Sequence, residues 1–252
     1  EELAVTGSGG LIAGLLSHAI GAPPIEALGS EDLKTTVLTE ILAGESISAL
    51  AVTEPGGGSD VANLTTTARR EGDHYIVNGS KIFITSGMRA DYITTAVRTG
   101  GPGMEGISLL VIPGEASGLT RTPLKKMGWW ASDTATLYFD NCRVPAENLL
   151  GAENMGFPAI MLNFNYERLW LAAGCVAFAR TCFNEVVAYA KDRVDPSLIS
   201  NFSDLTAPEW AGRICVRSSN NVYNQSLLAA MVAQQGADVA ESWAEGVVSN
   251  LA

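Results

Sequence analysis

The sequence predicts an α+β fold in which helical segments flank a central β domain. Apolar residues repeat at helical spacing near the start, short β-rich runs punctuated by glycine and proline fill the middle, and a long apolar helical pattern follows. With 252 residues, of which 47% are hydrophobic and 17% charged, the chain can bury a substantial core. We expect an antiparallel sandwich or barrel between N-terminal helices and a C-terminal helical bundle.

Three regions follow from these changes in pattern: partial N-terminal helices over residues 1–47, a β domain over 48–150 and partial C-terminal helices over 151–252. In the first region, the spacing predicts a helix over residues 3–20, which Gly21-Ala22-Pro23-Pro24 is expected to end. A second helix is predicted over about 31–43, with Ser30 as N-cap and acidic residues in its first turn.

In the middle region, Asn78-Gly79 predicts a type I′ turn between strands His74–Val77 and Lys81–Thr85, because these residues adopt positive φ angles readily. Further strands are predicted at Tyr92–Thr99, Gly106–Ile112, Leu119–Pro123 and Ala135–Asp140.

After Pro145 the pattern is helical again. One long helix is predicted over Phe157–Arg193, followed by a polar break at Val194–Thr206. A second helix is expected from Ala207 to about Gln235, and a third from Asp238.

Charge and cysteine content narrow the function classes. The formal net charge of −11 would repel a polyanionic duplex, so we expect no nucleic-acid partner. The four cysteines show no CxxC spacing and the chain has two histidines, so no metal site is predicted. Cys175 and Cys182 lie in an apolar helical run and are expected to be buried free thiols. Reduced thiols fit a bacterial cytoplasm or a mitochondrial matrix.

The N-terminal segment indicates neither a secretory signal nor a membrane span. Its longest apolar run, Gly10–Leu16, is too short to cross a bilayer. The sequence begins with Glu1-Glu2 rather than Met, from which we expect a fragment of a longer protein.

The run Ala51–Asp60 holds three consecutive glycines, Gly56, Gly57 and Gly58, flanked by the hydroxyls of Thr53 and Ser59. Glycines leave backbone N–H groups uncovered, so a flat or anionic ligand can approach the main chain. Most such loops are ordinary turns, and both interpretations stay open on the loop alone.

Glu167 is the best candidate for a catalytic base. Its helical neighbours are largely apolar, and partial desolvation would raise its pKa toward the range that suits proton abstraction from carbon. The alternative from the pattern alone is that Glu167 and Arg168 are adjacent surface charges in water.

Five segments, in order, give the chain its resemblance to the acyl-CoA dehydrogenase family of flavoenzymes. They are Ala51–Asp60, Tyr75–Ser86, Lys126–Thr134, Asp140–Gly151 and Tyr166–Gly174. The resemblance implies helices, then a β domain, then helices. It also implies FAD-dependent dehydrogenation of an acyl-CoA thioester to the 2-enoyl-CoA, as in fatty-acid β-oxidation.

The resemblance assigns Glu167 as the base that removes the α-proton while hydride passes to the flavin N5, as in isovaleryl-CoA and long-chain dehydrogenases. It assigns Ser59 and Arg168 to substrate binding. Residues expected to bind FAD are Thr53, Gly57, Gly58, Ser59, Phe83, Thr85 and Arg193. An electron-transfer flavoprotein is the implied electron acceptor, and a homodimer or homotetramer is the implied assembly.

The sequence departs from the family pattern after Arg193, where Val194-Asp195-Pro196-Ser197 replaces an expected Phe-Gly-Lys stretch. The glycine-rich element that holds the adenosine half of FAD, and the first N-terminal helices, have no counterpart. Two alternatives therefore remain beside the dehydrogenase: an acyl-CoA oxidase that passes electrons to oxygen, and a truncated, non-catalytic subunit that serves as a scaffold.

Overall fold

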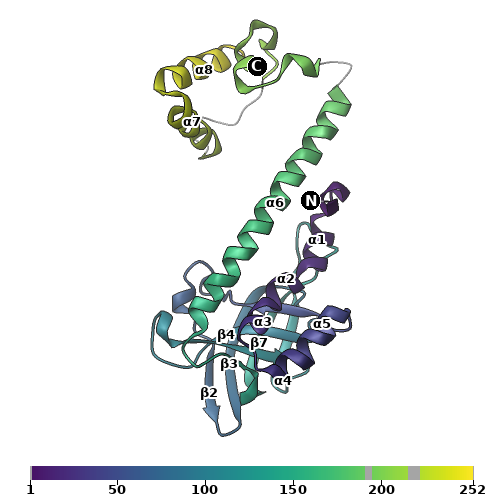
Figure 1. The fold of residues 1–252 in the computed structure, drawn as a ribbon, viewed down its shortest axis with the longest axis vertical. Coiled ribbons are helices and arrows are strands. Elements are labelled where there is room, and N and C mark those ends of the chain that lie inside the picture. The colour runs from purple at the N-terminus through teal and green to yellow at the C-terminus, as the bar shows by residue number, and fades with distance from the viewer. Residues whose placement is uncertain (1, 191–194, 215–221, 252) are drawn as a thin grey trace. The chain divides into compact units, whose positions relative to one another are not determined.

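A computed structural model describes residues 2–190, 195–214 and 222–251 of the chain. The chain divides into two compact units, Glu1–Thr181 and Cys182–Ala252. The first holds the N-terminal helices, the β-sheet and most of the long helix α6 (Gly156–Ala190); the second holds the short helices that follow it (Figure 1). Each unit buries a hydrophobic cluster of its own.

The predicted single helix over residues 3–20 is wrong, because this segment forms three short helices, η1 (Glu2–Thr6), α1 (Gly9–Leu16) and α2 (His18–Gly21). Helix α3 (Pro23–Leu28) follows them. Gly7, with φ +66°, separates the first two, and Ser17 separates α1 from α2. Pro23 begins α3 instead of ending a helix, since the first helical turn has no intrahelical use for the N–H that proline lacks.

The predicted helix over 31–43 is confirmed. It consists of α4 (Glu31–Leu33), a π-helical turn η2 (Lys34–Leu38) and α5 (Thr39–Ala43). Ser30 caps it by accepting a hydrogen bond from the N–H of Leu33 at 3.2 Å. Gly44 ends it in the left-handed conformation, at φ 76°.

Eight strands form the sheet of the first unit. They are β1 (Ser48–Ala51), β2 (Thr67–Glu71), β3 (His74–Thr85), β4 (Tyr92–Arg98), β5 (Ile107–Pro113), β6 (Leu119–Pro123), β7 (Thr134–Pro145) and β8 (Leu149–Leu150), with short 3-10 turns η3 (Val61–Asn63), η4 (Met104–Gly106) and η5 (Ala146–Asn148) between them. Their order is β6-β7-β3-β2-β4-β5-β8, and β1 also pairs with β4. Most pairs are antiparallel as predicted, but β4 pairs in parallel with both β1 and β2, so the sheet is mixed.

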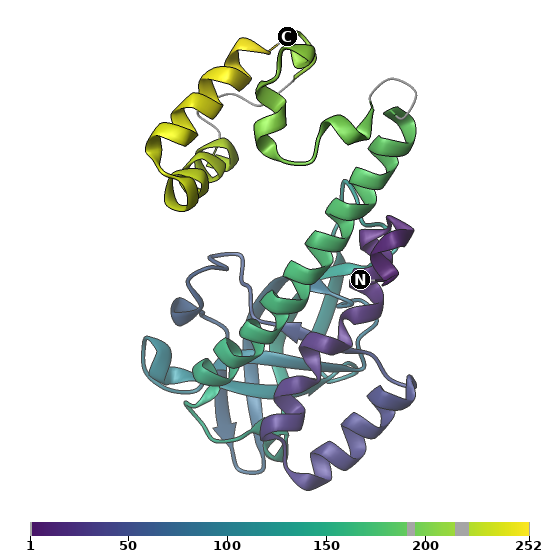
Figure 2. The same cartoon turned by 45° about the horizontal axis from the view of Figure 1, so that its top comes forward.

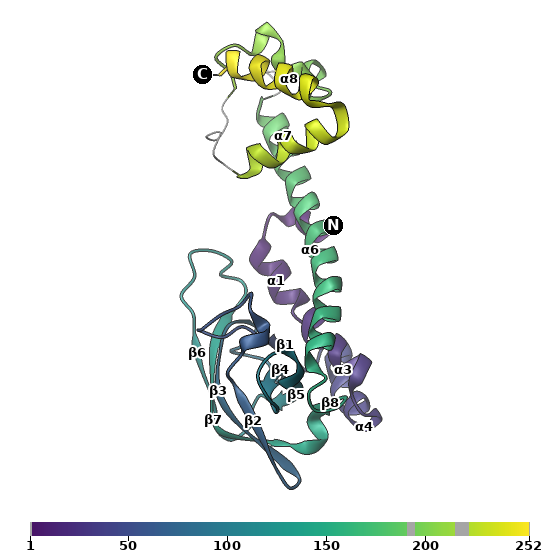
Figure 3. The ribbon, with the colours of Figure 1, turned by 90° about the vertical axis from the view of Figure 1, so that its left-hand side faces the viewer.

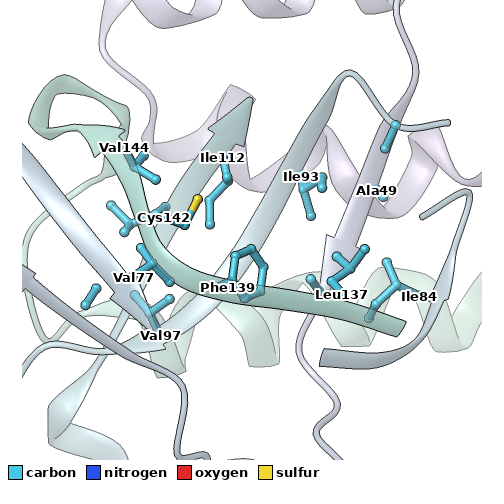
Figure 4. Close-up of a cluster of buried hydrophobic side chains, with 14 of the residues drawn as sticks. Ala49, Val77, Ile84, Ile93, Val97, Ile112, Leu137, Phe139, Cys142 and Val144 are labelled. Carbon is cyan, nitrogen blue, oxygen red and sulfur yellow. The ribbon is translucent and has the colours of Figure 1, made fainter. Parts of the chain in front are cut away.

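The sheet is folded over on itself into two layers (Figure 3). Strands β2 and β4, which join the layers, share one residue pair, Thr67 with Arg98. Side chains from both layers fill the space between them, among them Val77, Ile93, Ile112 and Leu137 (Figure 4). The arrangement therefore has the sandwich character that the sequence predicts.

The predicted hairpin at Asn78-Gly79 is wrong, because β3 continues through these residues. The hairpin that forms joins β2 to β3 through Gly72, which has φ +63°. The irregularity here is a bulge in β7, where Asp140 and Asn141 stand opposite Asn78, between the pairs Val77 with Cys142 and Gly79 with Phe139. The Asn78 side chain accepts a hydrogen bond from the N–H of Asn141 on β7 at 2.8 Å, which keeps β3 on its neighbour.

The N-terminal helices and α6 cover the outer face of β5. Ile25 and Ile41 from the helices and Ile160 from α6 are buried with Leu109 of β5 in a second cluster. Within this unit α6 runs beside α1–α3 (Figure 2), and the side-chain amide of Asn163 donates to the carbonyl of Ile20 at 3.1 Å. The expectation of a helix over 157–193 is thus confirmed as far as residue 190.

The cysteine prediction needs correction. Cys175 and Cys182 are exposed, because they lie on faces of α6 that no other described element covers, while Cys142 is buried in the sheet. Cys215 lies outside the described residues.

The second unit is a set of short helices. They are η6 (Pro196–Leu198), η7 (Phe202–Thr206), η8 (Pro208–Trp210), α7 (Val222–Gln235) and α8 (Ala237–Ser249). The third predicted helix is confirmed as α8. The helix predicted from Ala207 is wrong in its first part, because Pro208 opens a 3-10 turn that buries Trp210 against Val247 of α8.

No described helix is by itself both long and apolar enough to cross a membrane, although the bent pair Gly9–Leu16 and His18–Leu28 reaches that length and composition when taken together.

Candidate functional site

The glycine loop follows β1 and is closed at its base by two backbone hydrogen bonds. The N–H of Glu54 donates to the carbonyl of Gly57 at 3.1 Å, and the N–H of Gly57 donates back at 3.0 Å. Gly56, Gly58 and Ser59 are exposed, and no hydrogen bond among the described residues uses the N–H of Gly58 or Ser59. The loop therefore presents open backbone donors, as the sequence predicts.

A buried ion pair lies beneath this loop. The Lys81 ammonium, which is fully buried on β3, donates to the Glu54 carboxylate at 2.8 Å and to the carbonyl of Val52 at 3.0 Å. Burial favours a protonated Glu54, but the Lys81 charge and hydrogen bonds from Lys81, Thr66 and Thr65 outweigh it and lower the Glu54 pKa to about 2. Burial lowers the pKa of Lys81 to about 8, with Glu54 opposing, so both groups are charged at neutral pH.

A bulge in β3 brings Phe83 next to the loop. The register with β7 shifts between Lys81 and Ile84, Phe83 takes φ +62°, and its ring is 65% exposed. A positive φ is uncommon for an aromatic residue. The N–H of Ile82 donates to the carbonyl of Thr53 at 2.9 Å, which joins the bulge to the start of the loop. Thr85 is half-buried further along β3, where it pairs with Thr134.

Glu167 lies on the face of α6 that turns toward the rest of the unit. Ile160, Asn163 and Glu167 follow one another at helical spacing; the first two are buried, and Glu167 is half-buried. Burial raises the pKa of the Glu167 carboxyl above its ordinary value, and the charge of Arg168 opposes the rise. A half-desolvated carboxylate with a raised pKa suits general-base work.

Arg168, the next residue on α6, lines a cavity of about 440 Å³ with the end of the glycine loop. Gly58 and Ser59 lie on one side of this cavity, and Phe164 and Arg168 lie on the other. The Arg168 guanidinium lies over the Phe164 ring, 5.8 Å from its centroid, and donates to the side-chain oxygen of Asn165 at 3.3 Å. A cation, an aromatic ring and open backbone N–H groups together suit an anionic ligand that also carries a flat ring.

The structure thus brings the predicted residues together in two groups. Thr53 and Phe83 are linked through Ile82, and Gly58 and Ser59 share a cavity with Arg168. Among the described residues, no hydrogen bond or shared cavity links Glu167 directly to either group. Arg193 lies outside the described residues.

Glu54 and Lys81 are the residues that sequence reasoning missed. The spacing of residues along β3 could have identified Lys81 as buried. Tyr75, Val77 and Lys81 are separated by even numbers of residues, which places them on the same face of the strand, and all three are buried. A lysine on the inward face of a strand needs a buried acid or several acceptors. Glu54 is the acid that meets this need.

The residues present fit a flavin cofactor at this place. Adding a Cβ at Gly56 or Gly57 meets no atom within 4 Å, so the space beside the loop is open to a ligand. The exposed Phe83 ring offers a flat apolar surface next to it, and the loop N–H groups suit phosphate oxygens. Among the described residues, no group of three or more His, Cys, Asp or Glu side chains could hold a metal ion.

Family models match two parts of the chain. The model for "Acyl-CoA dehydrogenase, middle domain" matches residues 49–142, and that for "Acyl-CoA dehydrogenase, C-terminal domain" matches residues 154–203.

Curated relatives and solved structures agree with these matches. Acyl-CoA dehydrogenase AFT10-1 of Alternaria alternata is 43% identical over 77% of this chain and 45% of its own length. A short-chain specific acyl-CoA dehydrogenase of Clostridium acetobutylicum is 39% identical over 77% and 52%. The crystal structure of a probable acyl-CoA dehydrogenase from Mycobacterium abscessus is 45% identical, with a TM-score of 0.69 over 94% of this chain and 58% of the other. The chain therefore spans about half the length of the curated relatives that it matches.

Proposed function

This chain belongs to the acyl-CoA dehydrogenase family, and from that premise we propose that it takes part in the FAD-dependent α,β-dehydrogenation of an acyl-CoA thioester. The single observation that carries the proposal is the cavity in which Ser59 of the glycine loop and Arg168 of α6 meet, one residue from the half-buried Glu167. A loop made for a flat, anionic cofactor and a desolvated carboxylate thus belong to one unit of the fold.

Glu167 is the proposed catalytic base. Its carboxylate accepts the α-proton of the thioester, and its raised pKa strengthens it as a base. Bound FAD supplies the acceptor for the β-hydride. Protonation turns the charged Glu167 carboxylate into a neutral carboxyl, which partial burial favours. This position therefore suits a base that takes a proton away from bulk water.

The proposed binding residues surround this base. Ser59 and Arg168 hold the anionic coenzyme A portion, since a guanidinium and backbone N–H groups both bind phosphate oxygens. Thr53, the backbone of Gly57, the N–H groups of Gly58 and Ser59, the Phe83 ring and Thr85 hold the flavin, with Arg193 assigned by resemblance alone.

The finer features of the proposal concern substrate, partners and location. We propose an acyl-CoA of short, branched or medium chain, with electrons passing to an electron-transfer flavoprotein, and a homodimer or homotetramer as the assembly. The free thiols of Cys142, Cys175 and Cys182 suit a bacterial cytoplasm or a mitochondrial matrix.

The test is a visible absorption spectrum of the purified chain with added FAD, followed by anaerobic addition of acyl-CoAs of increasing length and branching. We expect a bound oxidised flavin whose absorption bleaches with at least one acyl-CoA, and that acyl-CoA identifies the substrate class. Peroxide formation under air then separates an oxidase from a dehydrogenase that needs an electron-transfer flavoprotein. A chain that binds no FAD in the titration contradicts the proposal and favours a non-catalytic scaffold.

A further inference from the structure

We infer that Glu54 and Lys81 are positioning residues that hold the glycine loop against β3, so that Thr53 and Phe83 form one surface for the flavin. Neither residue touches the open face of the loop; both lie beneath it. The inference rests on the proposed function. It adds how Thr53 of the loop and Phe83 of β3 are held in fixed positions relative to each other.

Consecutive residues of β3 hold consecutive residues of the loop. Lys81 donates to the Val52 carbonyl at 3.0 Å and to the Glu54 carboxylate at 2.8 Å, while the N–H of Ile82 donates to the Thr53 carbonyl at 2.9 Å. Three hydrogen bonds from two residues fix the position of the loop along β3. Phe83 follows directly, so its ring is placed by the same short segment.

Glu54 also binds the residues at the far end of the loop segment, Thr65 and Thr66. Its second carboxylate oxygen accepts hydrogen bonds from the N–H of Thr65 at 2.6 Å and from the Thr65 hydroxyl at 2.7 Å. Its first oxygen accepts from the N–H of Thr66 at 2.9 Å as well as from Lys81. One carboxylate therefore ties down both ends of the segment 54–66, whose tip is exposed.

The choice of a charged pair here is informative, because stability alone does not need it. The other inward positions of β3, Tyr75 and Val77, are filled without charge. Replacing a buried ion pair by packed apolar groups is often neutral or stabilising, whereas removing one partner is strongly destabilising. Directional bonds to Val52 and Thr66 supply a fixed geometry that an apolar contact at Lys81 would not.

The experiment separates positioning from stability by comparing Lys81→Met, Glu54→Gln and the double variant with the unchanged chain. Tyr75→Phe is the matched control, because it removes another buried bond of β3, from the Tyr75 hydroxyl to Glu153 at 2.6 Å, away from the loop. Three quantities are measured for each: the thermal unfolding midpoint, the Kd for FAD by flavin fluorescence, and amide hydrogen exchange of the peptide 53–66.

We expect the single variants to unfold at lower temperature, because each leaves a buried group unpaired. The double variant holds no unpaired buried charge and should regain that part of the loss, yet bind FAD about tenfold or more weakly and exchange faster over 53–66. Tyr75→Phe should lower the unfolding midpoint while leaving the Kd for FAD unchanged.

Two results would overturn the inference. One is a double variant with the Kd and the exchange of the unchanged chain; the other is a Tyr75→Phe variant that loses as much FAD affinity as the double. If the unchanged chain binds no FAD, the proposed function fails. The exchange of 53–66 then decides the role of the pair, and unchanged exchange in the double variant overturns it.

Discussion

Glu167 and Arg168 are neighbours in sequence with different surroundings. A step of one residue along a helix turns the side chain by about 100°, so Glu167 faces the packed side of α6 while Arg168 reaches the cavity beside Ser59. The sequence alone left this pair open between a base and two solvated charges. The half-burial of Glu167 and the placement of Arg168 favour the first interpretation.

Glu167→Gln tests the base directly. The amide has nearly the same shape but accepts no proton, so we expect the rate of flavin reduction by acyl-CoA to fall about 100- to 10,000-fold. FAD binding should stay unchanged. Anaerobic stopped-flow absorption measures the rate, and Glu185→Gln, an exposed carboxylate on the same helix, serves as the control. Normal reduction by the Glu167 variant would show that another group takes the proton.

The pH dependence of the same reaction tests the electrostatics of the site. Glu167 must be ionised to act, so activity should rise with pH through a pKa above the ordinary glutamate value. Arg168 opposes this rise, and Arg168→Gln should therefore move the acidic limb of the profile to still higher pH. The rate of flavin reduction, measured from pH 4 to 9 for the unchanged chain and for Arg168→Gln, gives the acidic limb of each profile. A limb that stays in place in Arg168→Gln would mean that Glu167 does not set it.

At the scale of elements, the pairing of β3 with β7 decides the geometry of the candidate site. A bulge in β7 opposite Asn78 and a bulge in β3 after Lys81 shift the register in opposite senses, so the twelve residues of β3 stay paired with β7. The bulge in β3 turns Phe83 outward. Without the second bulge, Phe83 would share the inward face of Tyr75, Val77 and Lys81.

Gly79→Ala should weaken the β domain. Gly79 has φ +144°, and a Cβ there would lie 2.7 Å from the Thr66 Cα, so both backbone strain and a main-chain clash follow. We expect the free energy of unfolding to fall by about 1–3 kcal/mol or more, measured by denaturant unfolding. Gly101→Ala is the control, because a Cβ there meets nothing within 4 Å. Equal stability of the two variants would contradict this account of Gly79.

At the scale of the whole molecule, the Glu54–Lys81 pair makes folding stability depend on acid pH. The pKa of Glu54 is about 2 in the folded chain against an ordinary value of 4.5, so the folded state favours the ionised form. This contribution is fully present above about pH 4.5 and is lost as the pH falls toward 2. It amounts to about 3 kcal/mol, which is the free-energy equivalent of that pKa difference.

Denaturant unfolding between pH 7 and 2.5 measures this loss. Lys81 stays protonated throughout that range, so Glu54 is the partner that titrates. The Glu54→Gln variant should be less stable at pH 7 and should lose less stability on acidification than the unchanged chain. Parallel pH curves for the two proteins would assign the acid sensitivity to other carboxylates.

Local sequence was enough for features that depend on near neighbours. The N-cap at Ser30 and the long apolar helix α6 follow from capping and spacing, and the structure has them. Helix α8 begins at Ala237, one residue before the predicted Asp238. The five motifs likewise identified the family, which the matches to residues 49–142 and 154–203 confirm. Errors arose where a local signal had two uses: Asn78-Gly79 suits a turn or a strand position opposite a bulge, and Pro23 suits the end or the first turn of a helix.

By itself, then, the sequence determined the family and the order of helices, β domain and helices, and it proposed the residues for the chemistry. The tertiary structure decided whether those residues meet. The exposure of Phe83 depends on pairing with β7, the cavity of Ser59 and Arg168 depends on where α6 lies, and the partner of Lys81 is 27 residues away in the chain. Such contacts are set by packing between distant segments, and neither propensity nor spacing within one segment contains that information.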